Sequence, residues 1–458
     1  MISDETGSGP TRASRAGIVG WVLFDWAMQP FFTLVTTFVF APWFAAHLAR
    51  DPASGQAQWG YATAFAGLII AVLSPVLGSI ADALGRHKPW VAAFGVLMML
   101  GASSLWLAAP GHPAAVALAL AGFVIGTIGA EFATVFNNAM MPRLVPQEEL
   151  GRLSGTGWAV GYVGGLVSLV LVLGFLAASP ETGRTLLGLT PLFGLDPATG
   201  AGARATGPLS ALWFVVFVLP MFLFTPDSHH GGKAAETIGV GLARLADTAR
   251  DLKAVPSLGR FLLANMIYTD GLVALFAFGG IYAAGVFGWS TIELGVFGIL
   301  LTITGSLGAW VGGRLDDRLG SKAVVLGALV LLFAMLVLVV SIDRSHVLFV
   351  VAVAPPAGGL YAGTAAKVYL AAGAVIGLAA GPLQAASRTQ LARMAPAGAV
   401  ARFYGFFALS GKVTSFMGPL AVALVTDWTD SQRAGAGVLA IFLITGFVLM
   451  AGVRTPQR

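Results

Sequence analysis

Long apolar segments separated by short polar ones recur along the whole chain. A helix that crosses the hydrocarbon layer of a membrane needs about 20 mostly apolar residues. Twelve segments reach this length. We predict transmembrane helices near 18–47, 58–81, 89–109, 114–138, 154–178, 208–225, 258–285, 291–312, 322–342, 367–390, 404–426 and 435–453. The shorter apolar run at 346–354 is predicted to be a loop or a re-entrant segment.

The amino-acid composition leads to the same class of protein. Hydrophobic residues make up 57% of the 458 residues and charged residues only 10%, whereas a soluble protein carries roughly 25% charged residues. The chain has no cysteine, which excludes disulfides, thiol catalysis and zinc–thiolate sites. The histidines are scattered, and we find no nucleotide-binding motif. We therefore predict an all-α integral membrane protein with no catalytic site, no metal site and no cofactor.

The distribution of basic residues predicts how the chain is oriented. Most of the 26 Lys and Arg residues lie between the predicted helices on the side that carries both termini. Loops rich in Lys and Arg stay in the cytoplasm, so we predict cytoplasmic termini in a bacterial-type plasma membrane. The net charge of +5 then reflects topology, and no nucleic-acid partner is expected.

The longest connection on that side divides the predicted helices six and six. Its middle spaces apolar residues at helical intervals, which favours an amphipathic helix on the membrane surface. We predict an N-terminal six-helix half at 1–225, a cytoplasmic amphipathic linker at 226–257 and a C-terminal six-helix half at 258–458. The expected assembly is a monomer in the lipid bilayer.

Two motifs recur at matching places in the two halves. In the segment after the second predicted helix and in the segment after the eighth, Gly78, Asp82 and Gly85 match Gly313, Asp317 and Gly320. After the fourth and tenth predicted helices, Arg143, Pro146, Gly155 and Gly161 match Arg393, Pro396, Gly405 and Gly411. Glycine allows close contact between helices and a tight turn, and aspartate can cap a helix or form an ion pair with a basic residue. We interpret the first pair as gating loops, which also contain Arg86 and Arg318.

These motifs resemble the signature of the major facilitator superfamily. Gly78, Asp82, Gly85, Arg86 and Lys88 match it, while Ala83 replaces an arginine that the second copy keeps as Arg318. Within that superfamily the chain is most similar to the unknown-major-facilitator group, which includes the autophagy-related vacuole effluxers. The matching stretches are GWVLFDWA at 20–27, NAMMPRLVP at 138–146, GWAVGYVGG at 157–165, YTDG at 268–271, QAASR at 384–388, FYGFFALSGK at 403–412 and GP at 418–419. The resemblance implies the major facilitator fold, secondary transport and amino-acid efflux.

Charged residues well inside the predicted helices, away from the ends, are few and cost about 2.5–3.5 kcal/mol each to insert. They are Asp25, Glu131 and Asp270 in the first, fourth and seventh helices, with Arg388 in the tenth and Lys412 in the eleventh. In the resembled superfamily the first, fourth, seventh and tenth helices line a central cavity. We therefore predict a substrate and ion pathway formed by Asp25, Gln29, Glu131, Asn138, Tyr268, Asp270, Gln384, Arg388 and Lys412.

Helical spacing groups several of these side chains on common faces. Asp25, Gln29 and Thr33 follow an i, i+4, i+8 pattern, and Glu131, Thr134 and Asn138 follow i, i+3, i+7. Structural roles remain open as alternatives. Lys412 could pair with Asp270, Arg388 could pair with Glu131 or reach towards the membrane surface, and the aromatic residues could serve packing alone.

The segment GWVLFDWAMQPFF at 20–32 combines a carboxylate with a helix-breaking residue. Pro30 cannot donate a backbone hydrogen bond, which leaves the carbonyl of Trp26 without its helical partner. We predict a hinge at this turn.

These observations predict a secondary transporter of a small solute. Repeated halves with a site between them are typical of transporters that work by alternating access. A buried carboxylate suits coupling to protons, and a small polar or zwitterionic solute suits a cavity with both acids and bases. The alternatives are a receptor or scaffold that does not transport, and an exporter of lipids or drug-like compounds.

Overall fold

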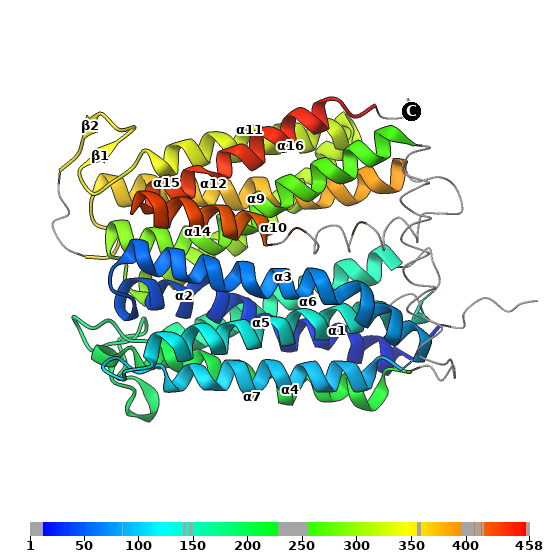
Figure 1. The fold of residues 1–458 in the computed structure, drawn as a ribbon, viewed down its shortest axis with the longest axis horizontal. Coiled ribbons are helices and arrows are strands. Elements are labelled where there is room, and N and C mark those ends of the chain that lie inside the picture. The colour runs from blue at the N-terminus through cyan, green and yellow to red at the C-terminus, as the bar shows by residue number, and fades with distance from the viewer. Residues whose placement is uncertain are drawn as a thin grey trace, which may run out of the picture.

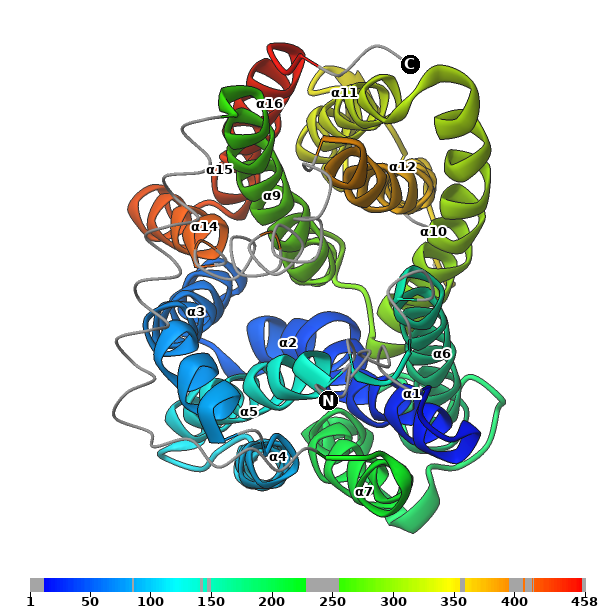
Figure 2. The ribbon, with the colours of Figure 1, turned by 90° about the vertical axis from the view of Figure 1, so that its right-hand side faces the viewer.

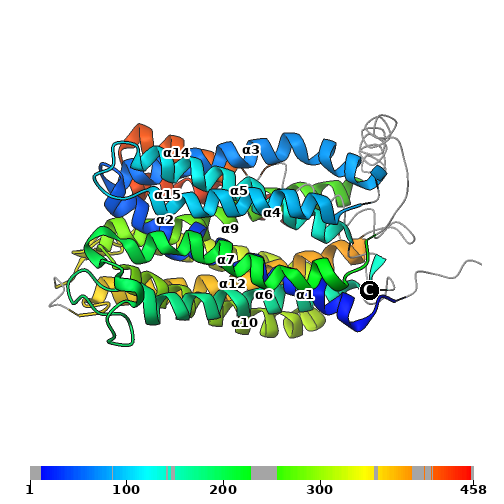
Figure 3. The same cartoon turned by 90° about the horizontal axis from the view of Figure 1, so that it is seen from below.

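The structure is a computed structural model in which long helices lie side by side along one axis (Figures 1 and 3). It describes residues 12–84, 86–140, 143–145, 150–227, 255–354, 359–394, 407, 414 and 416–454. The start of α1 and the end of α16 lie at one end of the bundle, which we call the terminus end. The other end carries the connections around residues 177–200 and 341–363, and we call it the loop end.

The first half consists of helices and helical turns up to residue 224. Its elements are α1 (Arg15–Pro30), η1 (Phe31–Phe38), α2 (Phe40–Trp43), η2 (Phe44–Leu48), α3 (Pro52–Leu84), α4 (Lys88–Ser104), η3 (Leu105–Leu107), α5 (Ala115–Met140), α6 (Leu150–Leu171), η6 (Val172–Leu176), η7 (Leu192–Gly194), η8 (Pro197–Thr199) and α7 (Ala201–Phe224).

The second half begins at residue 256 and contains a short hairpin besides its helices. Its elements are α9 (Pro256–Phe287), α10 (Thr291–Leu319), α11 (Ser321–Val340), β1 (His346–Val347), β2 (Val351–Ala352), α12 (Thr364–Met394), α14 (Met417–Thr429), α15 (Gln432–Gly437) and α16 (Leu439–Ala451). The strands pair antiparallel, with His346 opposite Ala352. The apolar run at 346–354, predicted as a loop or re-entrant segment, thus begins as a two-stranded hairpin.

The helices follow the predicted segments closely. Within the described residues, nine helical stretches are long and apolar enough to span a membrane. The helices α3 and α6 with η6 occupy the places of two further predicted spans, and α14 covers the part of the predicted span at 404–426 that begins at Met417. The sixth predicted span was too short at its start, because helix α7 already begins at Ala201. Most of the predicted linker at 226–257 lies outside the described residues, and the domain boundaries stay a prediction.

The same pattern of helix packing occurs in both halves. In the first half α1 packs against α6 and α7, α4 packs against α5 and α7, and α3 packs against α5. The corresponding pairs of the second half are α9 with α14 and α16, α11 with α12 and α16, and α10 with α12. Figure 2 shows the two groups on either side of the bundle when it is viewed from the terminus end. This repetition fits the internal repeat in the sequence.

Helix α1 changes its winding at the proline that the sequence singled out. The α-helix ends at Pro30 and continues as the π-helix η1, whose end is marked by a bond from the Val39 amide to the Leu34 carbonyl. Pro30 leaves the Trp26 carbonyl without a helical donor, and the Trp213 indole N–H in α7 donates to it at 3.1 Å. The two tryptophan rings also stack, with centroids 5.7 Å apart. A side chain from another helix thus replaces the missing backbone bond.

Replacing Trp213 by phenylalanine should lower the free energy of unfolding by about 1 kcal/mol, because the Trp26 carbonyl then loses its donor. In a Pro30→Ala background the loss should shrink, since residue 30 then has an N–H for that carbonyl. Thermal unfolding of the four variants in detergent measures this coupling. Equal losses in both backgrounds would contradict the assignment.

The segments predicted as gating loops are mostly helical. Gly313, Asp317 and Arg318 lie in the last turns of α10, and Gly78 and Asp82 lie in α3. Arg86 and Gly320 lie outside the helices, and the φ of 85° at Gly320 favours glycine. The prediction of loops was therefore wrong for Asp82, Gly313, Asp317 and Arg318, because the helices extend past their apolar parts. Gly78 lies inside the predicted helix at 58–81, and the gating role stays a prediction. Gly85 and the side chains of Asp82 and Asp317 lie outside what the structure describes.

Candidate transport pathway

Asp25 lies on the face of α1 that packs against a row of glycines in α6. Its carboxylate fills the space where a side chain at Gly157 would stand, and its Cβ lies next to Gly161. The side chain is half-buried, and within the described part of the chain it makes no hydrogen bond or ion pair. The glycines therefore make room for a carboxylate inside a helix pair without supplying a charge that would balance it.

The polar face of α1 continues towards the loop end as the spacing predicted. The Gln29 amide donates to the Thr33 hydroxyl at 3.5 Å, and both side chains lie against Gly165 of α6. Asp25, Gln29 and Thr33 thus share one face. That face packs against glycines of α6, where any side chain larger than that of glycine would collide with Asp25, Gln29 or Thr33.

The predicted residues of α5 differ in their surroundings. Glu131 is half-buried, and Asn138 is exposed near the terminus end. The Thr134 hydroxyl donates to the Ala130 carbonyl of its own helix at 2.8 Å. The Thr134 hydroxyl is therefore bonded within its own helix, whereas the side chain of Asn138 is exposed.

Asp270 and Tyr268 lie on different sides of α9. Asp270 is only 3% exposed, and its backbone carbonyl packs against Gly418 of α14. The Thr414 hydroxyl approaches the Asp270 carboxyl without reaching hydrogen-bond geometry. Tyr268 is buried against Gly446 of α16, and its hydroxyl shares a hydrogen bond of 2.7 Å with Ser387 of α12. Tyr268 thus connects three helices of one half.

The remaining predicted residues lie in the tenth and eleventh predicted helices. Gln384 and Arg388 are half-buried on α12, and Arg388 lies near Tyr162 of α6 in the other half. Lys412 lies outside the described residues, so its predicted pairing with Asp270 stays a prediction. Among the described residues, no group of His, Asp and Glu could hold a metal ion.

Hydrogen bonds join the two halves at the loop end. The buried Gln56 amide of α3 donates to the Thr426 hydroxyl of α14 at 2.8 Å and to the Gln432 carbonyl of α15 at 3.3 Å. The Gln432 amide donates back to the Pro52 carbonyl at 2.9 Å. We call Gln56, Thr426 and Gln432 the amide clasp. It closes the interface between the halves at this end.

Glycines let the halves approach closely around the amide clasp. A side chain at Gly435 would collide with Thr426 and Gln56, and one at Gly285 would collide with Gln432. Gly280 of α9 packs against Thr37 and Pro42 of the first half. Sequence reasoning missed the clasp, and its only signal was an uncharged glutamine at the start of an apolar helix.

An ion pair holds together the terminus end of the second half. The Arg393 guanidinium of α12 donates to the Asp316 carboxylate of α10 at 2.8 Å and to the Ser321 hydroxyl of α11 at 2.6 Å. The Ser321 hydroxyl in turn donates to Asp316 at 2.7 Å. The sequence motif pointed to Asp317, whereas this described contact is made by its neighbour Asp316.

We expect Asp316→Asn to lower the free energy of unfolding by about 2 kcal/mol, because Arg393 then loses a partner that is only 7% exposed. A double-mutant cycle with Arg393→Gln measures the interaction through thermal unfolding. Glu181→Gln, at an exposed loop position, serves as the control. Additive losses in the cycle would refute the pairing.

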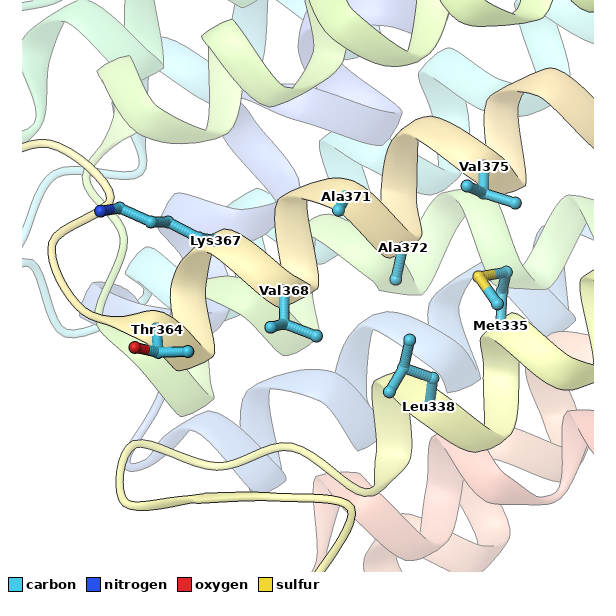
Figure 4. A pocket seen from close by; sticks show the side chains of 8 residues that line it. All are labelled: Met335, Leu338, Thr364, Lys367, Val368, Ala371, Ala372 and Val375. Atoms are coloured by element: carbon cyan, nitrogen blue, oxygen red, sulfur yellow. The ribbon is translucent and has the colours of Figure 1, made fainter. Parts of the chain in front are cut away.

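A hollow of about 340 Å³ lies apart from these polar residues, between α11 and α12 (Figure 4). Its wall is apolar, with side chains such as Met335, Leu338 and Val375, and Lys367 extends from its edge. It contains none of the predicted pathway residues. Its chemistry suits hydrocarbon rather than a polar solute.

Comparison with known proteins decides the family. Residues 56–457 match the family described as vacuole effluxer Atg22 like. The chain belongs to this family. Over 437 residues it is 24% identical to an uncharacterised major-facilitator-type transporter, YxiO of Bacillus subtilis, covering 94% of each chain. It is 27% identical over 313 residues to autophagy-related protein 22 of Cryptococcus neoformans, covering 67% of this chain and 53% of that longer one. The Atg22-like chain is therefore a membrane transporter rather than an enzyme.

The fold of this Atg22-like transporter is that of the major facilitator superfamily. The crystal structure of a D-xylose-proton symporter superposes with a TM-score of 0.64 and 12% identity, over 96% of this chain and 97% of the symporter. The resemblance expected from the sequence motifs is confirmed at the level of family and fold. At this identity the likeness carries no information on the substrate.

Proposed function

We propose that this transporter couples the movement of a small polar solute to protons through Asp25. The observation that carries the proposal is a carboxyl within a transmembrane helix that has no partner among the described residues. An uncompensated charge in a membrane is costly, so a proton or a cationic group of the solute is its natural partner. A group that takes up and releases this partner in turn provides coupling.

The amide clasp supports alternating access as the mechanism. It closes the loop end through neutral hydrogen bonds that can break and form again when the halves rock about a central site. Asp25 and Asp270 lie on the first helix of each half, and each helix packs against glycines of the fifth helix of its own half. We propose that the solute binds between these helices, in reach of Glu131, Gln384 and Arg388.

An amphoteric solute of the amino-acid type fits a site that offers carboxylates together with a guanidinium. The family resemblance favours efflux as the direction. The bias of basic residues favours a plasma membrane location with both termini in the cytoplasm. We propose that Tyr268 acts as a structural tie, because its hydroxyl is already bonded to Ser387.

Reconstitution into liposomes tests the proposal in two steps. A thermal-shift screen of the purified protein against amino acids, peptides and sugars first identifies a solute. Uptake driven by a pH gradient and counterflow of labelled solute without a gradient are then compared. Transport under both conditions, faster with the gradient, is expected. Binding without counterflow would indicate a receptor, and counterflow that ignores the gradient would rule out proton coupling.

A further inference from the structure

A groove between the start of α4 and the end of α7 combines basic and apolar side chains. It has a volume of about 660 Å³ and lies at the terminus end. Figure 2 shows α4 and α7 next to each other at the outer edge of the first half. We propose that this groove binds the phosphate headgroup of an anionic phospholipid. The proposal concerns a site outside the transport pathway.

Two cations face the groove. Arg86 is exposed, and in the described part of the chain its guanidinium makes no hydrogen bond or ion pair. The Lys88 ammonium donates one hydrogen bond to the Phe222 carbonyl at 2.8 Å, which leaves it two further donors. A guanidinium binds two phosphate oxygens at once, and an ammonium adds a point charge.

The acidic residue of the groove is already engaged. The Asp227 carboxylate accepts the backbone N–H of His87 at 3.0 Å and that of Lys88 at 3.1 Å. It thereby caps the first turn of α4 and attaches the end of α7 to it. Asp227 keeps its negative charge, and the two cations Arg86 and Lys88 together leave the groove with an excess of positive charge.

The apolar wall distinguishes a lipid from a dissolved anion. Leu223 is 70% exposed and Phe224 is 55% exposed, directly beside the two cations. A dissolved phosphate gains nothing from such side chains, whereas a phospholipid covers them with its acyl chains. Basic side chains at the ends of transmembrane helices are suited to anionic headgroups. The groove therefore combines basic side chains for a headgroup phosphate with apolar side chains for acyl chains.

Lipid titration of the purified full chain tests the proposal. We expect phosphatidylglycerol to raise the thermal unfolding temperature in detergent and phosphatidylcholine to have little effect, because only the bound form is stabilised. Arg86→Gln should weaken the apparent affinity for phosphatidylglycerol about tenfold, as expected for the loss of one charge-assisted pair. Arg15→Gln, an exposed arginine at the same end but outside the groove, should leave it unchanged.

Three outcomes would overturn the proposal. Equal effects of the two lipids would show that the headgroup charge is irrelevant. An unchanged affinity in Arg86→Gln would place the lipid elsewhere. Equal stabilisation by glycerol phosphate would indicate a site for a dissolved anion. If Arg86→Gln does not fold, native mass spectrometry of the unmodified protein decides, since selective retention of phosphatidylglycerol over phosphatidylcholine is required.

Discussion

Replacing Asp25 by asparagine should reduce uptake driven by a pH gradient to the level of empty liposomes. Asparagine has nearly the same shape and fits the same space against Gly157, but it cannot bind and release a proton. Counterflow of labelled solute needs no net proton movement, so a fraction of it should persist. The loss is therefore expected in coupling rather than in solute exchange. Parallel measurement of both activities in one liposome preparation tests this expectation.

The matched control is Asp51→Asn. Asp51 lies outside the helices at the loop end, and its carboxylate is bonded to Arg50 and Ser54. That variant should retain proton-driven uptake. The proposal for Asp25 fails if Asp25→Asn retains proton-driven uptake, and coupling through any of the three carboxyls fails if Glu131→Gln and Asp270→Asn retain it as well. A loss in Asp270→Asn alone would transfer the coupling role to the second half.

Breaking the amide clasp should open the loop end. The chain contains no cysteine, so a single cysteine at Ala423, which is fully buried against Gly60, reports on this interface without background. Gln56→Ala removes two hydrogen bonds and leaves the buried Thr426 hydroxyl without its donor, which costs about 1–3 kcal/mol. We expect labelling by a membrane-impermeant maleimide to accelerate about tenfold or more, since 1.4 kcal/mol corresponds to a factor of ten.

Thr63→Ala serves as the control for the clasp. Its hydroxyl donates to the Trp59 carbonyl within α3, so its loss removes a hydrogen bond without affecting the contact between halves. Gly435→Ala should act like Gln56→Ala, because the added methyl group collides with Thr426. Labelling that stays slow in both Gln56→Ala and Gly435→Ala would show that the clasp does not hold the halves together.

Much of the fold could be predicted from the sequence because lipid imposes a simple rule. Every long apolar segment must be a helix, and the segments recur at regular intervals. The same rule does not predict where the helices end, because helices can extend beyond their apolar segments. The last turns of α3 and α10 contain Asp82, Asp317 and Arg318, and their polarity resembles that of a loop although the backbone remains helical.

The contacts between helices could be predicted less well. The carbonyl of Trp26 was expected to lack a partner, but nothing in the local pattern pointed to Trp213, which lies 187 residues away. Gln56 and Gln432 are likewise 376 residues apart and meet only when the halves pack. Helical spacing places side chains on a face of one helix, whereas the neighbour of that face depends on the whole fold.

The amide clasp contains no ionisable group. Its hydrogen bonds join amides, a hydroxyl and backbone carbonyls, so their strength should vary little with acidity or salt concentration across the physiological range. A proton gradient therefore does not directly change the strength of the hydrogen bonds in the clasp. In the proposed mechanism, a proton binds at a carboxyl elsewhere, and the effect reaches the loop end as rigid-body movement of the halves. Substitutions in the amide clasp and substitutions of the coupling carboxyl should therefore change the closure of the loop end and the proton coupling independently.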